Sequence, residues 1–314
     1  MKIKLVAFLA LIFVGQLATA QQSKEYTVKE EIYGRKEGVA LTMQVFRPKQ
    51  SNGAAVIRLI SGSWYSSMEN WERYKPGAAL YLDKGYTYFL VAHGSNPRYN
   101  IQEAAADVKR AVQYIRYHAK EYGIDPNKIG ITGSSAGGHL SLVTGLGDNR
   151  GDSLAKDPIA RISGKANVVA VFYPPTDFMN WGGMGISPVN YPNFLEANGV
   201  AGAFAFRYYD TTKKNYVFIT DLKERVKIAE SLSPANLVTH DDPAVFIWHG
   251  DADKTVPLQQ SKWLEEKYKA LNLPFELRIK AGEDHGWKTQ LNEEADFVTW
   301  FDKYLQPKVV KKSK

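Results

Sequence analysis

The sequence predicts an α/β fold, in which a mostly parallel β-sheet carries helices on both faces. Short apolar runs of four to eight residues recur along the chain, and most are nearly continuous, as expected for strands buried on both sides. Helical patterns lie between these runs, and the alternation of strands with helices favours parallel pairing through crossover connections. The 314 residues are 44% hydrophobic and 23% charged, which allows a sizeable core.

Seven runs rich in apolar, β-branched and aromatic residues are the predicted strands. One of them contains Arg58, a charged residue that is unusual in a buried strand. The predicted strands are Val39–Phe46, Ala54–Ile60, Tyr86–Ala92, Ile129–Thr132, Val168–Tyr173, Ala244–Trp248 and Phe275–Ile279.

The clearest helix begins at Asn100, a favourable N-cap, with Glu103 three residues later as in a capping box. Its apolar residues follow at steps of four and three and therefore share one face; they are Ile101, Ala105, Val108, Val112, Ile115 and Ala119. Gly123 ends this helix. Further helices are predicted after Ser135, from about Leu258 to Leu271 and from about Gln290 to Leu305.

The stretch from about 174 to 233 interrupts the alternation of strands and helices. Twelve aromatic residues lie between Phe172 and Phe218, both included. A structureless loop of that length is uncommon in a compact domain. We therefore expect a partly helical insertion that covers part of the molecule, within a single domain spanning residues 21–314.

The first twenty residues, Met1 to Ala20, have the pattern of a secretory signal peptide. Two lysines precede the apolar run Leu5–Val14, and small residues follow at Ala18-Thr19-Ala20. The apolar run is too short to span a bilayer, which argues against the alternative of an uncleaved anchor. The expected location is therefore periplasmic or secreted.

Composition narrows the expected environment and partners. The chain has no cysteine, so it folds without disulfides and lacks the cysteine that a lipoprotein anchor needs; no stable membrane anchor is expected. Removing the two lysines of the signal peptide lowers the formal net charge from +7 to +5. No basic stripe with interleaved aromatic residues is present, which argues against nucleic acid as a partner. The oligomeric state stays open.

A candidate nucleophile lies in Gly133-Ser134-Ser135-Ala136-Gly137, between a predicted strand and a predicted helix. The pattern Gly-x-Ser-x-Gly places Ser135 at its centre and excludes Ser134. Glycines two residues away suit a serine on a strained strand-to-helix turn, because neighbouring backbone approaches too closely for side chains. A Gly/Ser turn without chemistry is the simpler alternative, but the strand and helix on either side favour a nucleophile.

A serine hydroxyl needs a base, and the base needs an acid that orients it. Among the six histidines, His285 lies in a loop between a predicted strand and the last predicted helix, where a base can reach the edge of the sheet. We expect packing or hydrogen bonding for His139 and a structural role for His249. The acid should follow the preceding strand, and there both Asp251 and Asp253 are candidates, which spacing alone does not separate.

An oxyanion hole would complete this chemistry, since backbone N–H groups stabilise the negative charge of a tetrahedral intermediate. The residue after the nucleophile, Ala136, supplies one donor. The others are expected from the loop Ile60-Ser61-Gly62-Ser63-Trp64-Tyr65.

These segments resemble the α/β-hydrolase superfamily and, within it, the branch that includes hormone-sensitive-lipase-like esterases and bacterial feruloyl or acetylxylan esterases. The similar stretches are DVKRAVQYIRYHAKEYGIDPNKIGITGSSAGGHLSL, HGDADKTVP and EDHGW. The resemblance implies an α/β-hydrolase fold with a cap insertion, and it implies that Asp253 is the acid and that the N–H groups of Gly62 and Ser63 join Ala136. The histidine that usually opens the oxyanion loop in this branch is replaced by Ile60.

The expected function is that of an exported serine esterase that uses Ser135, His285 and Asp253 and requires neither a metal nor an organic cofactor. Its expected substrates are small-molecule or oligosaccharide esters, with short-chain or aromatic acyl groups on carbohydrate preferred because flat aromatic rings suit such groups. A peptidase similar to prolyl oligopeptidase, a binding protein with an idle triad and a glycoside hydrolase with paired carboxylates are the alternatives.

Overall fold

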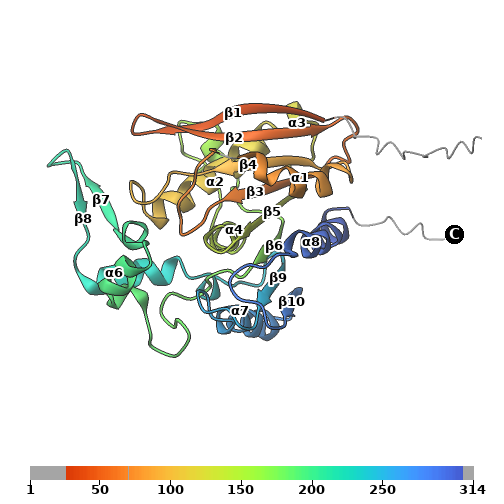
Figure 1. Cartoon of the computed structure of the whole chain (residues 1–314). Helices are drawn as coiled ribbons and strands as arrows, with labels where there is room; N and C mark the ends of the chain where they lie inside the picture. Colours follow the sequence, from red (N-terminus) through yellow and green to blue (C-terminus); the bar gives the residue numbers. More distant parts are fainter. Residues whose placement is uncertain (1–25, 70, 307–314) are drawn as a thin grey trace, which may run out of the picture.

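The computed structural model describes residues 26–69 and 71–306, so the predicted signal peptide, Met1 to Ala20, lies outside the described residues. The chain forms an eight-stranded sheet in the order β1-β2-β4-β3-β5-β6-β9-β10, flanked by helices (Figure 1). β1 pairs antiparallel with β2, and β2 antiparallel with β4. All pairs from β4 to β10 are parallel. The predicted α/β class with a mostly parallel sheet is confirmed.

Each predicted strand coincides with an observed one to within two residues at either end. The strands of the sheet are β1 (Tyr26–Lys36), β2 (Val39–Pro48), β3 (Ala55–Ile60), β4 (Thr87–Ala92), β5 (Ile129–Ser134), β6 (Val168–Phe172), β9 (Ala244–Gly250) and β10 (Phe275–Lys280). β3, β4 and β6 are buried at every residue, which explains their continuous apolar sequence.

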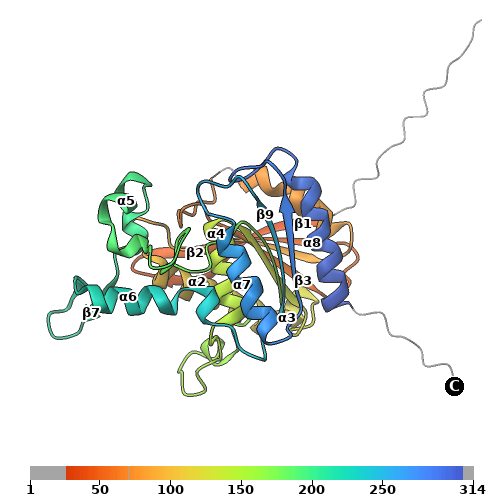
Figure 2. The same ribbon diagram turned by 90° about the horizontal axis from the view of Figure 1, so that it is seen from below.

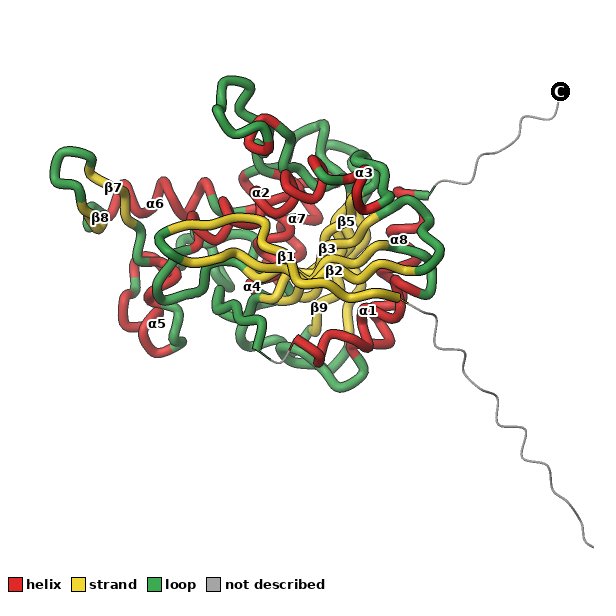
Figure 3. Tube along the Cα trace, turned by 90° about the horizontal axis from the view of Figure 1, so that it is seen from above, coloured by secondary structure: helices red, strands yellow, loops and turns green. Residues whose placement is uncertain are grey.

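The edge strand β1 was not among the predicted strands. Only Tyr33 in it is buried, and its other side chains are exposed or half-buried and largely charged or polar, so it has no apolar run. Lysine and glutamate along an exposed edge discourage pairing with another sheet. Figure 3 shows β1 and β2 lying across the remaining strands, as the twist of a sheet produces.

Two helical layers enclose the sheet. Figure 2 shows α2, α4 and α7 on one side and α8 on the other. The apolar residues divide accordingly, because α2, α4 and α7 share one buried cluster while α1 and α8 share a second. The helices of these layers are α1 (Lys75–Leu82), α2 (Ile101–Tyr117), α3 (Ala119–Tyr122), α4 (Ala136–Leu146), α7 (Gln259–Ala270) and α8 (Gln290–Leu305).

The predicted capping box at the start of α2 is present. The Glu103 N–H donates to Asn100 Oδ1 at 3.1 Å, and the Asn100 N–H donates to Glu103 Oε2 at 2.8 Å. The helix breaks at His118 and resumes as α3, which Gly123 ends in a left-handed conformation with φ 69°.

The stretch from 174 to 233 contains short helices, as expected, and also a two-stranded hairpin that the sequence did not predict. The hairpin projects away from the sheet (Figure 1). Its strands carry exposed or half-buried residues and therefore have no apolar run. The elements are η3 (Pro188–Asn190), α5 (Pro192–Ala197), η4 (Ala201–Phe204), β7 (Arg207–Asp210), β8 (Asn215–Phe218) and α6 (Leu222–Ser231).

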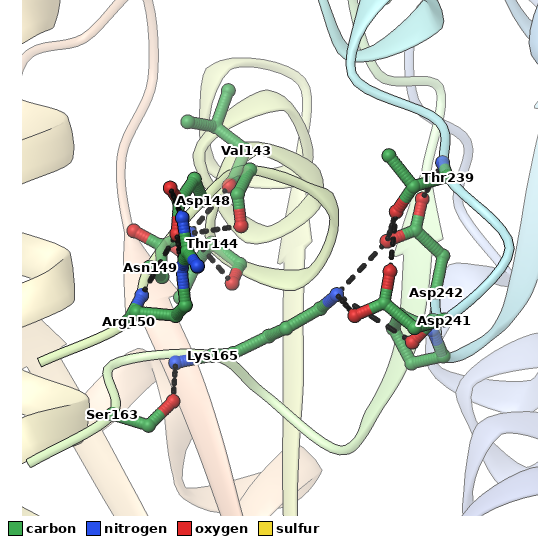
Figure 4. A network of polar contacts seen from close by, with 12 residues as sticks. Val143, Thr144, Asp148, Asn149, Arg150, Ser163, Lys165, Thr239, Asp241 and Asp242 are labelled. Carbon is green, nitrogen blue, oxygen red and sulfur yellow. Dashed lines mark hydrogen bonds and ion pairs between the residues drawn. The ribbon is translucent and has the colours of Figure 1, made fainter.

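Lys165 lies in the loop before β6 and contacts Asp241 and Asp242 in the loop before β9, so it joins these two loops (Figure 4). Its Nζ lies 3.0 Å from Asp242 Oδ1 and 3.1 Å from Asp241 Oδ2. Burial raises the pKa of Asp242, although the hydrogen bonds from Thr239 and Lys165 oppose this effect. Binding sites in open parallel sheets lie at the carboxyl ends of the strands, so this network is structural.

Candidate active site

Ser135 sits on a sharp turn between β5 and α4. Its backbone has φ 54° and ψ −122°, a conformation that residues with a side chain rarely adopt. A Cβ on Gly133 would lie 2.4 Å from the backbone of Gly137, and a Cβ on Gly137 would lie 3.3 Å from the Leu59 carbonyl oxygen. The turn therefore has the geometry of a nucleophile elbow, with glycine required on the strand side.

The structure brings Ser135, His285 and Asp253 together in one chain of hydrogen bonds. His285 Nε2 lies 2.9 Å from Ser135 Oγ, and His285 Nδ1 lies 2.8 Å from Asp253 Oδ2. An ionised carboxylate only accepts hydrogen bonds, so Nδ1 carries the hydrogen and Nε2 is left to accept the serine proton.

The two candidate acids occupy different places. Asp253 contacts His285, whereas Asp251 Oδ1 accepts the Gly282 N–H at 2.6 Å. Asp251 thereby joins the loop after β9 to the loop after β10, which is a structural role. The geometry favours Asp253, in agreement with the motif resemblance.

Several donors surround the Asp253 carboxylate. Oδ1 accepts the N–H groups of Thr255 and Val256, at 2.9 and 2.8 Å. His249, which is fully buried, places Nε2 3.3 Å from Oδ2. Burial alone would raise the pKa of Asp253, but the hydrogen bonds from His249, His285 and the Val256 N–H outweigh it and hold the pKa well below its usual range. Asp253 is therefore ionised at neutral pH.

The predicted oxyanion loop forms a tight turn. Tyr65 N–H donates to the Gly62 carbonyl at 2.8 Å, and Gly62 N–H donates to the Tyr65 carbonyl at 3.0 Å. The central residues Ser63 and Trp64 both have positive φ, 50° and 56°, as a type I′ turn requires. The N–H of Gly62 thus already has an acceptor within the turn, and its role as an oxyanion donor stays a prediction. Ser63 and Ala136 line the cavity beside Ser135.

This turn is supported without the histidine that usually opens the loop. His93 Nε2 lies 2.8 Å from Ser61 Oγ, and Asn96 donates its N–H to the Trp64 carbonyl at 3.0 Å. The Trp64 indole donates to His139 Nδ1 at 3.2 Å. His93 and His139 are buried, and burial lowers the pKa of each to about 4. Both therefore act as neutral hydrogen-bonding groups, which agrees with the expectation for His139.

Behind the elbow, Ser134 belongs to a buried polar network that the sequence did not indicate, apart from the unusual Arg58. Ser134 Oγ accepts from Arg58 Nη2 at 3.1 Å and from Gln290 Nε2 at 3.2 Å. Arg58 pairs with Glu294 at 3.0 Å. Tyr173 donates to Gln290 at 2.7 Å and packs its ring 4.5 Å from that of His285. The network therefore links Ser134, in the elbow, to Tyr173, which packs against His285.

A small apolar cavity of about 90 Å³ opens beside Ser135. The insertion supplies Trp181, Phe194 and Phe204 to its wall. Of the other rings in the insertion, Phe178 and Phe206 are buried, while Tyr191, Tyr208 and Tyr209 are exposed. Trp64, Phe178 and Phe204 pack together with centroid distances of 5.2 to 5.8 Å. The aromatic residues of the insertion therefore serve both as a small core and as a wall of the cavity.

The part of the chain that the structure describes contains neither a candidate metal cluster nor a candidate membrane span. Within residues 26–69 and 71–306, no cluster of three or more His, Cys, Asp or Glu side chains is placed to hold a metal ion. Over the same ranges, no helix has the length and apolar character needed to cross a bilayer.

The sheet order and the elbow define an α/β-hydrolase fold, as the motif resemblance implied. Solved structures agree with this fold. A truncated carbohydrate esterase from gut microbiota superposes with a TM-score of 0.69 at 23% identity, over 90% of this chain and 98% of that one.

The sequence profile of the BD-FAE family matches residues 43–268, and the chain belongs to this family. A probable carboxylic ester hydrolase, LipM of Mycobacterium tuberculosis, is 24% identical over 73% of this chain and 48% of its own length. An acetylxylan esterase of Xylanibacter ruminicola is 33% identical over 42% of this chain and 26% of its own length. The chain thus spans less than half the length of these relatives.

Proposed function

We propose that this protein is an exported serine hydrolase that cleaves carboxylic esters through an acyl-enzyme. The observation that carries the proposal is the continuous hydrogen-bonded chain from Ser135 through His285 to the ionised Asp253, which starts at a strained elbow. Similarity to proteins named as ester hydrolases supports the same reaction. Export rests on the signal-peptide pattern of Met1 to Ala20.

In the proposed reaction, Ser135 Oγ attacks the ester carbonyl while His285 Nε2 takes its proton. Asp253 keeps the imidazole in the tautomer that can accept this proton, and it stabilises the imidazolium that results. The N–H groups of Ser63 and Ala136 hold the oxyanion, aided by the amino-terminal end of α4. His285 then protonates the leaving alcohol and activates a water that hydrolyses the acyl-enzyme.

The cavity favours a compact acyl group. It is small and lined mainly by apolar residues, including Trp181, Leu195 and Val256. Such a wall accepts a short acyl chain or one face of an aromatic acid and offers no binding energy to a long chain. Together with the relative named as an acetylxylan esterase, this supports short-chain or aromatic acyl esters on carbohydrate as the substrates.

A fluorophosphonate probe together with p-nitrophenyl acetate tests the proposal. The wild type should be labelled and should hydrolyse the ester, whereas Ser135→Ala should lose labelling and several orders of magnitude in kcat. The neighbouring Ser134→Ala variant is the matched control and should keep its labelling. Labelling that is lost in Ser134→Ala and kept in Ser135→Ala would contradict the assignment of Ser135 as the nucleophile. Turnover of short peptide amides at rates comparable with esters would indicate a peptidase.

A further inference from the structure

The turn that carries Ser63 borders two hollows, which different residues of the turn line. Ser63 and Trp64 line the apolar cavity described above. Gly62 and Tyr65, the outer residues of the same turn, line a second hollow of about 180 Å³ with Ser67, Glu69 and Arg73. An ester bound with its carbonyl at this turn must place its acyl and alcohol parts in different directions, so the two hollows are available to the two parts.

The second hollow is lined by Ile60 and Gly62, the two neighbours of Ser61. Ser61 approaches the elbow so closely that a Cβ on Gly137 would lie 3.5 Å from the Ser61 Cβ. Arg73 also lines a further hollow of about 410 Å³, whose wall includes Arg58. Arg58 in turn contacts Ser134, the neighbour of the nucleophile, at 3.1 Å. The two hollows share Arg73 in their walls, and we call them together the Arg73 groove.

The lining of the Arg73 groove differs in chemistry from that of the acyl cavity. The Tyr65 side chain is 57% exposed and presents a flat ring. Glu69 offers a carboxylate acceptor and Arg73 a planar set of donors. Among the described residues, no carboxylate lies within ion-pair distance of the Arg73 guanidinium, which donates to Tyr74 Oη at 2.8 Å. The groove therefore combines an aromatic surface with polar groups that retain hydrogen-bonding capacity.

The charges of the groove nearly balance. Arg58 and Arg73 contribute two cations, and Glu69 and Glu294 contribute two carboxylates. A strongly charged ligand would gain little from such a lining. A sugar ring has an apolar face that can stack on an aromatic side chain and a rim of hydroxyls that both donate and accept, which matches this set of groups.

We infer that the Arg73 groove holds the sugar that forms the alcohol part of the proposed carbohydrate ester, with Tyr65 and Arg73 as the residues that determine specificity for this sugar. The inference rests on the proposed ester hydrolysis and extends it, because it assigns the acyl group and the sugar to the two different hollows that border the Gly62–Tyr65 turn.

The test compares esters that share an acetyl group and differ in the alcohol, namely an acetylated neutral oligosaccharide and p-nitrophenyl acetate. Tyr65→Ala and Arg73→Gln should each lower the ratio of the two kcat/KM values, sugar ester over aryl ester, by about tenfold, mainly through KM for the sugar ester. Tyr209→Ala removes a similarly exposed ring from the β7–β8 hairpin and should leave both activities unchanged.

A variant in the acyl cavity completes the test. Phe194→Ala alters the acyl cavity and should change the preference between acetate and longer acyl chains without changing the alcohol ratio. An alcohol ratio that stays constant in Tyr65→Ala and Arg73→Gln overturns the inference, even if both enzymes hydrolyse p-nitrophenyl acetate. A wild type that hydrolyses neither ester overturns the proposed function itself, which is a distinguishable result.

Discussion

At the scale of single residues, the two aspartates of one short loop have separate tasks. The Asp253 carboxylate accepts from two backbone N–H groups and faces two histidines, whereas the Asp251 carboxylate accepts from Gly282 across a loop junction. Hydrogen bonding around Asp253 fixes its orientation toward His285. The neighbourhood of Asp251 contains no contact with the proposed catalytic groups.

Replacing Asp253 by Asn should therefore lower kcat for an aryl acetate by about 10⁴-fold, because an amide no longer holds the imidazole in the productive tautomer. Asp251→Asn is the matched control in the same loop and should cost less than about tenfold, through the loop junction alone. Steady-state kinetics of both variants gives the two losses in kcat, and circular dichroism checks that both variants are folded. The reverse ranking would assign the acid to Asp251.

The buried histidines make stability depend on pH. Burial lowers the pKa values of His93 and His139 to about 4, so between about pH 6.5 and pH 4 the unfolded chain binds protons that the folded chain does not. The folded state therefore loses stability as the pH falls through this window, by about 1.4 kcal/mol per pH unit for each histidine.

Urea unfolding between pH 7 and pH 4.5 measures this slope. His93→Gln should reduce the slope by about one proton, whatever it does to stability at pH 7. His240→Gln, at an exposed position, should leave the slope as in the wild type. A wild-type free energy of unfolding that is constant from pH 7 to pH 4.5 would contradict buried neutral histidines.

The sequence was most informative for residues whose role depends on local context. Ser135 and His285 could be predicted from a glycine-flanked turn and a loop position, while Asp253 needed the motif resemblance. The engagement of Gly62 within its own turn could not be predicted, because the type I′ conformation falls on Ser63 and Trp64, which are not the glycine or asparagine that normally signal it. The partners of Arg58 lie up to 236 positions away in the chain, so no local pattern identifies them.

At the scale of elements, burial decided what the sequence could predict. β3, β4 and β6 are buried at every residue and have continuous apolar runs, and all three were predicted. β10 has no fully buried residue, and it was predicted from its apolar residues Phe275, Leu277 and Ile279. β1 and the β7–β8 hairpin are exposed and charged or aromatic, so their strand character depends on pairing rather than on pattern. The capping box of α2 was predictable because both of its hydrogen bonds are local.

The buried ion pair between β3 and α8 should be costly to break by removing only one of its partners. Arg58 and Glu294 side chains are only 10% and 8% exposed, and their N–O distance is 3.0 Å. Burial by itself lowers the pKa of Arg58, but Glu294 raises it above its ordinary value. Glu294→Ala leaves a buried cation unpaired and should reduce the free energy of unfolding by about 3–5 kcal/mol.

Two further variants separate loss of the pair from loss of a side chain. The double variant Arg58→Met, Glu294→Met removes both charges and should be much closer to the wild type than Glu294→Ala. Asp296→Ala breaks a more exposed pair with Arg278 and should cost at most about 1 kcal/mol. Guanidinium unfolding curves give all three values, and equal costs for Glu294→Ala and Asp296→Ala would refute the argument.

At the scale of the whole molecule, the insertion is joined to the catalytic edge of the sheet through aromatic packing. Phe178 and Phe204 contact Trp64 of the oxyanion turn, and Phe178 also lies 4.9 Å from the ring of His139 in α4. The same insertion supplies part of the cavity wall beside Ser135. The insertion thus contacts the Gly62–Tyr65 turn and also forms part of the wall of the proposed acyl cavity.

The surface of the insertion distinguishes two kinds of esterase. Its large exposed apolar side chains are mostly aromatic; they are Tyr191, Phe194, Tyr208, Tyr209 and Phe218, against the aliphatic Met184, Ile186 and Leu222. A lid that opens at a lipid surface needs a contiguous apolar patch. Here Phe194 lines the cavity while Tyr208, Tyr209 and Phe218 lie on the projecting hairpin, which favours soluble substrates.

We therefore expect acetylated oligosaccharides to be hydrolysed in solution and emulsified long-chain triglycerides to be hydrolysed at least about 100-fold more slowly, because the small cavity cannot desolvate a long acyl chain. Rates measured across the solubility limit of a short-chain triglyceride should show no jump. The double variant Met184→Ser, Ile186→Ser serves as the control, because it removes two exposed aliphatic side chains without altering the cavity lining. A jump in rate above the solubility limit that this variant abolishes would identify a lipase with an interfacial lid, and the carbohydrate-ester assignment would then be wrong.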